Sequence, residues 1–152
     1  MGTVSVEESR PERRMPAELA AINFSHAPFI VIWEVTRACD LACVHCRAEA
    51  VARRHPLELT TDEGRRLLEQ IREVGHPLVV LTGGDPIKRP DICDFIAYGD
   101  QIGLRMTITP SGTPLMTPAV IDRLKAAGLV RMAVSLDGST AAIHDDERRG
   151  QD

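Results

Sequence analysis

The sequence lacks the features that mark membrane, secreted and low-complexity proteins. No apolar run among its 152 residues approaches the ~20 residues needed to cross a bilayer, so no membrane partner is expected. The charged N-terminus, residues 1–14, has no apolar core of the kind a signal peptide needs. A composition of 43% hydrophobic and 26% charged residues is typical of globular proteins. We therefore expect a cytoplasmic globular protein.

An excess of basic charge is also missing. The chain has 18 Lys and Arg residues against 22 Asp and Glu residues, a formal net charge of −4. Nucleic-acid-binding domains usually carry a basic stripe or patch. This balance predicts that nucleic acid is not a partner.

Cysteine is scarce and bunched. There are 4 cysteines; Cys39, Cys43 and Cys46 share one short segment, and Cys93 stands alone. A secreted disulfide scaffold would spread its cysteines along the chain. Bunching in a reducing compartment points to metal or redox chemistry, whereas Cys93 is expected to be a small buried residue.

The hydrophobic pattern predicts an α/β fold. Short β-branched runs predict strands over 29–35, 78–82, 104–109 and 130–136, and capping residues with helical periodicity predict helices over 60–75, from 90–91 onward, and over 117–128. Strands alternating with helices imply parallel pairing and right-handed crossovers. A closed eightfold barrel needs ~250 residues, so the chain can build only about half a barrel or a small open sheet. The polar end, 141–152, does not look like a finished domain, so a fragment is expected.

Special turns follow every predicted strand. Because the carboxyl ends of parallel strands meet at one edge of the sheet, these turns converge there, where active sites of such folds lie. The four segments are 36–46, 82–86, 109–112 and 135–138.

The cysteine segment has the spacing C-x3-C-x2-C. Three thiolates on one loop can hold three corners of a [4Fe–4S] cluster and leave the fourth iron open. Zinc is the main alternative, since Cys3His sites are common and His45 lies inside the loop. However, structural zinc usually takes ligands from two knuckles, and no second pair exists in this sequence.

These motifs resemble the radical S-adenosylmethionine (radical SAM) superfamily. The cysteine motif follows the first strand, Gly83-Gly84-Asp85 the second, and Ser135-Leu136-Asp137-Gly138 the fourth. The resemblance covers roughly residues 28–150. The run from Trp33 to Cys39 is similar in style to members acting in haem-related biosynthesis or in peptide and quinone-cofactor maturation, often with a C-terminal SPASM extension. The fold implied is a partial (βα) barrel of the radical SAM type, here its first four parallel strands.

Residues 1–27 are polar and have no sustained periodicity, which predicts a loose N-terminal arm with a short helix over 17–22. The resemblance then implies a radical SAM core over 28–152. It also implies that a cluster-bound S-adenosylmethionine is cleaved reductively, giving a 5′-deoxyadenosyl radical that abstracts a substrate hydrogen. The implied metal ligands are Cys39, Cys43 and Cys46, and the implied cofactor-binding residues are Gly83, Gly84, Asp85, Ser135, Asp137 and His45. Asp85 replaces the family's usual Glu, and the segment 109–112 departs from the usual pattern by Pro110.

The partners implied are a small-molecule or peptide substrate and an electron donor such as a flavodoxin or ferredoxin. Arg37 and Lys88 flank the expected site, and we expect them to be solvated surface charges. Two alternatives stay open at this point. One is a non-catalytic module that binds zinc or an iron–sulfur cluster, and the other is an inactive truncated remnant.

Overall fold

A four-stranded parallel sheet organises the protein. The computed structural model describes residues 23–149. Its strands are adjacent in chain order and every neighbouring pair is parallel. They are β1 (Ile30–Thr36), β2 (Leu78–Gly83), β3 (Arg105–Ile108) and β4 (Arg131–Met132). The predicted α/β class with four parallel strands is confirmed, whereas the helix predicted over 17–22 lies outside the described residues.

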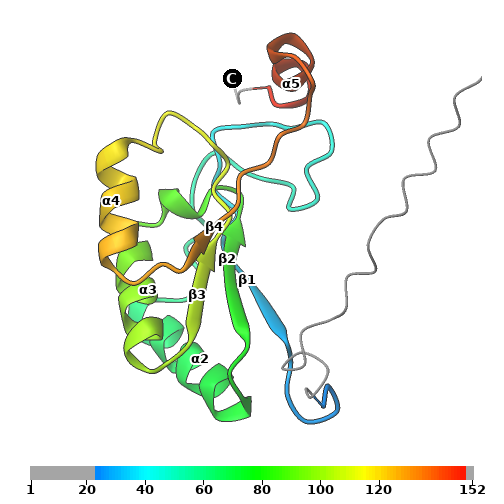
Figure 1. Ribbon diagram of the computed structural model, residues 1–152. Helices are drawn as coiled ribbons and strands as arrows, with labels where there is room; N and C mark the ends of the chain where they lie inside the picture. The colour runs from blue at the N-terminus through cyan, green and yellow to red at the C-terminus, as the bar shows by residue number, and fades with distance from the viewer. Residues whose placement is uncertain (1–22, 150–152) are drawn as a thin grey trace, which may run out of the picture.

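Three helices connect the strands and cover one face of the sheet (Figure 1). They are α2 (Thr61–Val74), α3 (Ile92–Gln101) and α4 (Pro118–Ala126), and a short 3₁₀ turn, η1 (Pro86–Lys88), follows β2. None of the helices in the described part of the chain has both the length and the apolar character of a membrane span.

The helix starts follow from local capping chemistry. The Thr60 hydroxyl accepts a hydrogen bond from the Glu63 amide at 3.3 Å, and the Glu63 carboxylate accepts one from the Thr60 amide at 2.8 Å. This reciprocal pair satisfies two amides that a helix start otherwise leaves unpaired. At α4 only one such bond forms: the Thr117 hydroxyl, ahead of Pro118, accepts from the Val120 amide at 3.3 Å. Both starts were predicted because a cap depends only on neighbouring residues.

The hydrophobic core lies between the sheet and the three helices. Trp33 on β1 contacts Phe95 on α3, with ring centroids 4.9 Å apart. The opposite face of β1 is open, with Ile32 63% exposed. Strand alternation therefore separates a packed face from an accessible one. The fully buried core side chains are Leu68, Val79, Leu81, Phe95, Ile96, Met106, Ile108 and Leu124.

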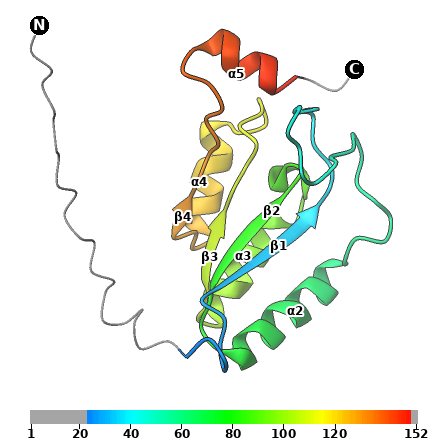
Figure 2. The same cartoon turned by 90° about the vertical axis from the view of Figure 1, so that its right-hand side faces the viewer.

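The end of the described chain differs from the sequence prediction. β4 has only two residues, because beyond Met132 the chain leaves the sheet toward the cysteine segment. The charged stretch that follows contains a helix, α5 (Ala141–Glu147), capped by Thr140. It buries none of its residues, so it has no apolar stripe by which sequence analysis could find it. α5 lies above the carboxyl ends of the strands (Figure 2).

Candidate functional site

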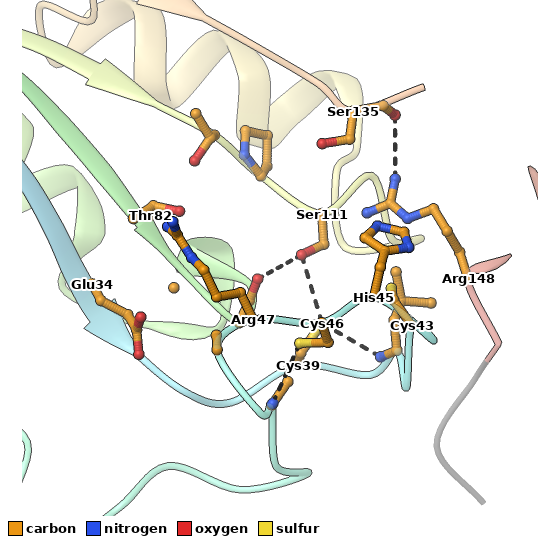
Figure 3. A pocket seen from close by; sticks show the side chains of 17 residues that line it. Glu34, Cys39, Cys43, His45, Cys46, Arg47, Thr82, Ser111, Ser135 and Arg148 are labelled. Atoms are coloured by element: carbon orange, nitrogen blue, oxygen red, sulfur yellow. Dashed lines mark hydrogen bonds between the residues drawn. The ribbon is translucent and has the colours of Figure 1, made fainter. Parts of the chain in front are cut away.

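A cavity of about 280 Å³ opens at the carboxyl ends of the strands (Figure 3). Cys39, Cys43 and Cys46 all line it, together with the turns that follow β2 and β3. The convergence predicted for the strand ends is therefore confirmed by the structure. The other polar and turn residues of the lining are Glu34, His45, Arg47, Thr82, Gly83, Gly84, Thr109, Pro110, Ser111, Ser135 and Arg148.

The three thiols of the cysteine loop are separate potential metal ligands. Cys39 is 4% exposed, and its amide donates to the Val51 carbonyl at 2.9 Å. A tight turn joins the other two, since the Cys46 amide donates to the Cys43 carbonyl at 3.0 Å. Within residues 23–149, no three His, Cys, Asp or Glu side chains form a group that could hold a metal ion as they stand. The thiols are distributed around one cavity.

Backbone amides point at two of the sulfurs. The Leu41 amide donates to the Cys39 sulfur at 3.4 Å, and the Ala50 amide donates to the Cys46 sulfur at 3.5 Å. Donors of this kind orient metal-binding thiolates and compensate their charge. The loop thus supplies both the sulfurs and part of their surroundings.

The glycine turn after β2 fits directly against the cysteine loop. The Gly84 amide donates to the Thr36 carbonyl at 2.8 Å, and the Asp85 amide donates to the Ala38 carbonyl at 2.7 Å. A Cβ on Gly84 would lie 2.5 Å from the Ala38 carbonyl oxygen, and one on Gly83 would lie 2.2 Å from that of Thr36. Both glycines line the cavity, but the close approach that requires them is between two segments of the protein's own backbone.

The carboxylate of Asp85 accepts a hydrogen bond from a neighbouring loop. The residue is fully buried and does not belong to the lining of the cavity. Its Oδ2 accepts from the Thr113 hydroxyl at 2.8 Å, and its Oδ1 accepts from the Ile87 amide at 3.1 Å. These bonds hold η1 and the loop after β3 together behind the glycine turn. The contact between Asp85 and S-adenosylmethionine stays a prediction.

The other three predicted cofactor residues gather around Arg148. Ser135 lines the cavity, and its carbonyl accepts from Arg148 Nη1 at 3.2 Å. Asp137 Oδ2 lies 3.3 Å from Arg148 Nε, and its Oδ1 lies 3.8 Å from His45 Nε2. His45 also lies 3.5 Å from Glu147 at the end of α5. One charged cluster therefore joins the cysteine loop, the segment after β4 and the last helix.

Three charged lining residues were missed by the sequence analysis. Glu34 shares the open face of β1 with Ile32, and strict strand alternation would have placed it there. Arg47 directly follows the last cysteine, and its side chain extends across the cavity toward Thr82 (Figure 3). Arg148 lies in the polar stretch whose helix carried no sequence pattern.

The two flanking cations were expected to be solvated surface charges, and both also bind the cysteine loop. The Arg37 side chain is 46% exposed and that of Lys88 only 20%. Arg37 donates to the Ala48 carbonyl at 2.9 Å and to the Glu49 carbonyl at 2.5 Å. Lys88 pairs with the Asp40 carboxylate. The reason is the loop's own conformation, which turns carbonyls and a carboxylate outward where these long side chains reach them.

Comparison with known proteins identifies the family. The family model described as the radical SAM superfamily matches residues 33–152. The chain belongs to the radical SAM superfamily. Members of this superfamily use a [4Fe–4S] cluster and S-adenosylmethionine, so the predicted cofactors agree with the family.

Curated relatives narrow the similarity to a subgroup. The chain is 40% identical over 127 residues to an AdoMet-dependent heme synthase of Methanosarcina barkeri, covering 84% of this chain and 36% of that protein. It is 47% identical over 116 residues to one of Nitratidesulfovibrio vulgaris, covering 76% and 31%. Mycofactocin maturase MftC of Mycobacterium tuberculosis is 34% identical over 119 residues, with 78% and 30% covered. The chain therefore spans about a third of the length of the curated relatives it matches.

The fold is shared with a solved protein structure. The crystal structure of Streptococcus suis SuiB bound to S-adenosylmethionine matches with a TM-score of 0.68 at 20% identity, covering 81% of this chain and 28% of that one. The partial-barrel prediction agrees with this match.

Proposed function

We propose that residues 28–152 form the core of a radical SAM enzyme, preceded by an arm over 1–27, and that Cys39, Cys43 and Cys46 ligate its [4Fe–4S] cluster. The observation that carries the proposal is the placement of all three thiols around one cavity at the strand ends. The bound cluster and S-adenosylmethionine supply reductive cleavage of a carbon–sulfur bond and a 5′-deoxyadenosyl radical for hydrogen abstraction.

The donor set suits such a cluster. Thiolates are the usual ligands of [4Fe–4S] clusters, and three separate sulfurs leave one iron without a protein ligand. The open position would be available to the amino and carboxylate groups of S-adenosylmethionine. The N–H groups directed at Cys39 and Cys46 help to hold the thiolates in place.

The remaining residues orient the cofactor and limit access. Gly83 and Gly84 would present backbone to the methionine end of a bound S-adenosylmethionine, with Asp85 fixing the turn from behind. Ser135 and Asp137 would hold its ribose hydroxyls and carboxylate, and His45 would contact its adenine. Arg47 adds positive charge to the same cavity, which favours a cofactor or substrate carrying carboxylates, whereas Arg148 is already paired with Asp137.

We propose a haem-related tetrapyrrole as the substrate class, because the AdoMet-dependent heme synthases are 40% and 47% identical to this chain. Peptide-derived cofactor maturation is the second candidate, supported by 34% identity to mycofactocin maturase. A flavodoxin or ferredoxin is the proposed electron donor.

The test is anaerobic reconstitution with iron and sulfide, followed by EPR of the dithionite-reduced protein with and without S-adenosylmethionine. We expect a cubane signal that changes when S-adenosylmethionine is added, and 5′-deoxyadenosine in the same sample. Stable zinc in place of iron, or a cluster that does not respond to S-adenosylmethionine, would overturn the proposal in favour of a binding module.

A further inference from the structure

The most completely buried basic side chain in the described region belongs to Arg89, which is 1% exposed. Its guanidinium makes a bidentate pair with Asp91, with Nε–Oδ1 at 2.8 Å and Nη2–Oδ2 at 2.6 Å. Nη1 donates to the carbonyls of Val35 at 3.1 Å and Leu59 at 3.0 Å. The guanidinium lies over the Phe95 ring, with Arg89 Cζ 4.8 Å from the ring centroid. All three guanidinium nitrogens therefore have hydrogen-bond partners.

This group secures the end of β1, from which the cysteine loop starts. Val35 precedes Thr36, whose hydroxyl donates to Glu58 at 2.6 Å and accepts from the Ala38 amide at 3.0 Å. Glu58 Oε2 in turn lies 4.0 Å from Arg89 Nη1. A continuous polar network therefore runs from Arg89 to the residue directly before Cys39.

The later part of the cysteine loop is anchored elsewhere. The Val44 amide donates to the Glu147 carbonyl at 3.0 Å, and the Ala42 amide donates to that of Arg149 at 2.5 Å. Cys43, between these two residues, therefore depends on the α5 segment and on its own turn. Cys39 instead follows directly on the exit of β1, three residues after Thr36.

We propose that Arg89 is a positioning residue for the Cys39 thiol, an inference that rests on the proposed role of Cys39 as a cluster ligand. A planar guanidinium can pair with a carboxylate at two points and donate to two carbonyls at once, whereas a lysine ammonium is a point charge with no fixed fork. Lysine at position 89 keeps the charge and loses this geometry. The thiol of Cys39 then loses its fixed burial while Cys43 and Cys46 keep theirs.

The experiment measures alkylation of each cysteine by iodoacetamide in the apoprotein under native conditions, read by mass spectrometry. We expect Arg89→Lys to raise the rate at Cys39 relative to Cys43 at least tenfold. The matched control is Arg65→Lys, because Arg65 also lies over a ring, 5.6 Å from the Tyr98 centroid, but its ion-pair partner is Asp62 on its own helix, at 3.9 Å. It should leave the ratio unchanged. If Arg89→Lys leaves the Cys39-to-Cys43 ratio unchanged, or raises the alkylation rate equally at all cysteines, Arg89 has only a general structural role and the proposal is overturned.

A second pair of variants keeps the test decisive where Arg89→Lys does not fold. Thr36→Val removes the hydroxyl that links Glu58 to the Ala38 amide, and Thr36→Ser restores it. The network is supported if Thr36→Val raises the alkylation rate of Cys39 relative to Cys43 and Thr36→Ser restores the original ratio. It is refuted if the ratio is the same in both variants. The apoprotein readout needs no cluster, so a failure to assemble one would refute the proposed function and leave this result standing.

Discussion

The hydroxyl oxygen of Ser111 lies 3.5 Å from the Cys39 sulfur and donates a hydrogen bond to the Gly84 carbonyl at 2.6 Å. One side chain thereby links the loop after β3 to the cysteine loop and to the glycine turn. The walls of the cavity are held together by contacts of this kind between loops that follow different strands.

Replacing Ser111 with alanine should lower the free energy of unfolding by about 1 kcal/mol, because the half-buried Gly84 carbonyl loses its donor. Urea unfolding followed by circular dichroism measures this. Ser139→Ala is the matched control, since Ser139 is exposed and its loss should change the free energy by under about 0.5 kcal/mol. Equal effects from the two variants would contradict the role given to Ser111.

Single alanine variants of Cys39, Cys43 and Cys46 should each fail to assemble a [4Fe–4S] cluster, because each removes one of only three protein ligands. Iron and sulfide content after anaerobic reconstitution, with the absorbance of the cluster, is the measurement. Cys93→Ala should assemble a normal cluster, since Cys93 packs beside the core on α3. A full cluster in Cys43→Ala would disprove the ligand assignment.

Gly84→Ala should destabilise the protein by about 1–3 kcal/mol, since the new methyl group overlaps two backbone carbonyls that cannot move independently. It should also reduce cluster assembly, because the turn is pushed away from the cysteine loop. Gly103→Ala is the control that distinguishes this steric overlap from the effect of backbone strain alone. Gly103 has a φ of 81°, and a Cβ there would meet only Arg72 Nε, at an ordinary contact distance of 3.8 Å, so its variant should cost about 1 kcal/mol and assemble a normal cluster.

The Arg89–Asp91 pair should give the protein an acid-sensitive stability. Burial would raise the pKa of Asp91, but hydrogen bonds from Arg89 and Thr61 outweigh it and hold the pKa below its ordinary value. A lowered pKa in the folded state means that the stabilisation is present above the ordinary value and is lost as pH falls through the folded value. The free energy of unfolding should therefore decline below about pH 4.

Asp91→Asn tests this directly. It leaves Arg89 buried without its charge partner, so at pH 7 we expect a loss of about 3 kcal/mol. The difference from the unsubstituted protein should shrink as the pH is lowered, measured by urea unfolding at several pH values. A difference that stays constant with pH would mean that the carboxylate charge is not the source of the stability.

Removal of residues 141–152 should release the middle of the cysteine loop. The amides of Ala42 and Val44 lose their acceptors in the α5 segment and should exchange with deuterium at least tenfold faster. The amides of Gly84 and Asp85, which bond to the β1 end of the loop, should exchange at an unchanged rate. Uniform acceleration at all four positions would show that the two parts of the loop are not anchored separately.

Local patterns account for what could be predicted from the sequence. Each of these patterns involves residues close in the chain: a cap such as Thr60, a β-branched run such as β2, and a cysteine spacing. The order of elements and the face carrying the site could therefore be predicted. The orientation of Asp85 could not be predicted, because it depends on Thr113, which comes from the loop after the next strand. Arg89 was missed for the same reason: its partners Val35 and Leu59 are distant in sequence, and a lone arginine resembles a surface charge.

The strand order β1-β2-β3-β4 also fixes when the cavity can exist during folding. Each new strand adds beside the previous one, so the sheet can grow in the direction of synthesis through contacts between consecutive units. The cysteines lie in the first connection, yet Gly84 comes after the second strand, Ser111 after the third and Ser135 after the fourth. The thiols therefore leave the ribosome long before their enclosure is complete, and a cluster inserted early would meet an open, solvent-filled loop.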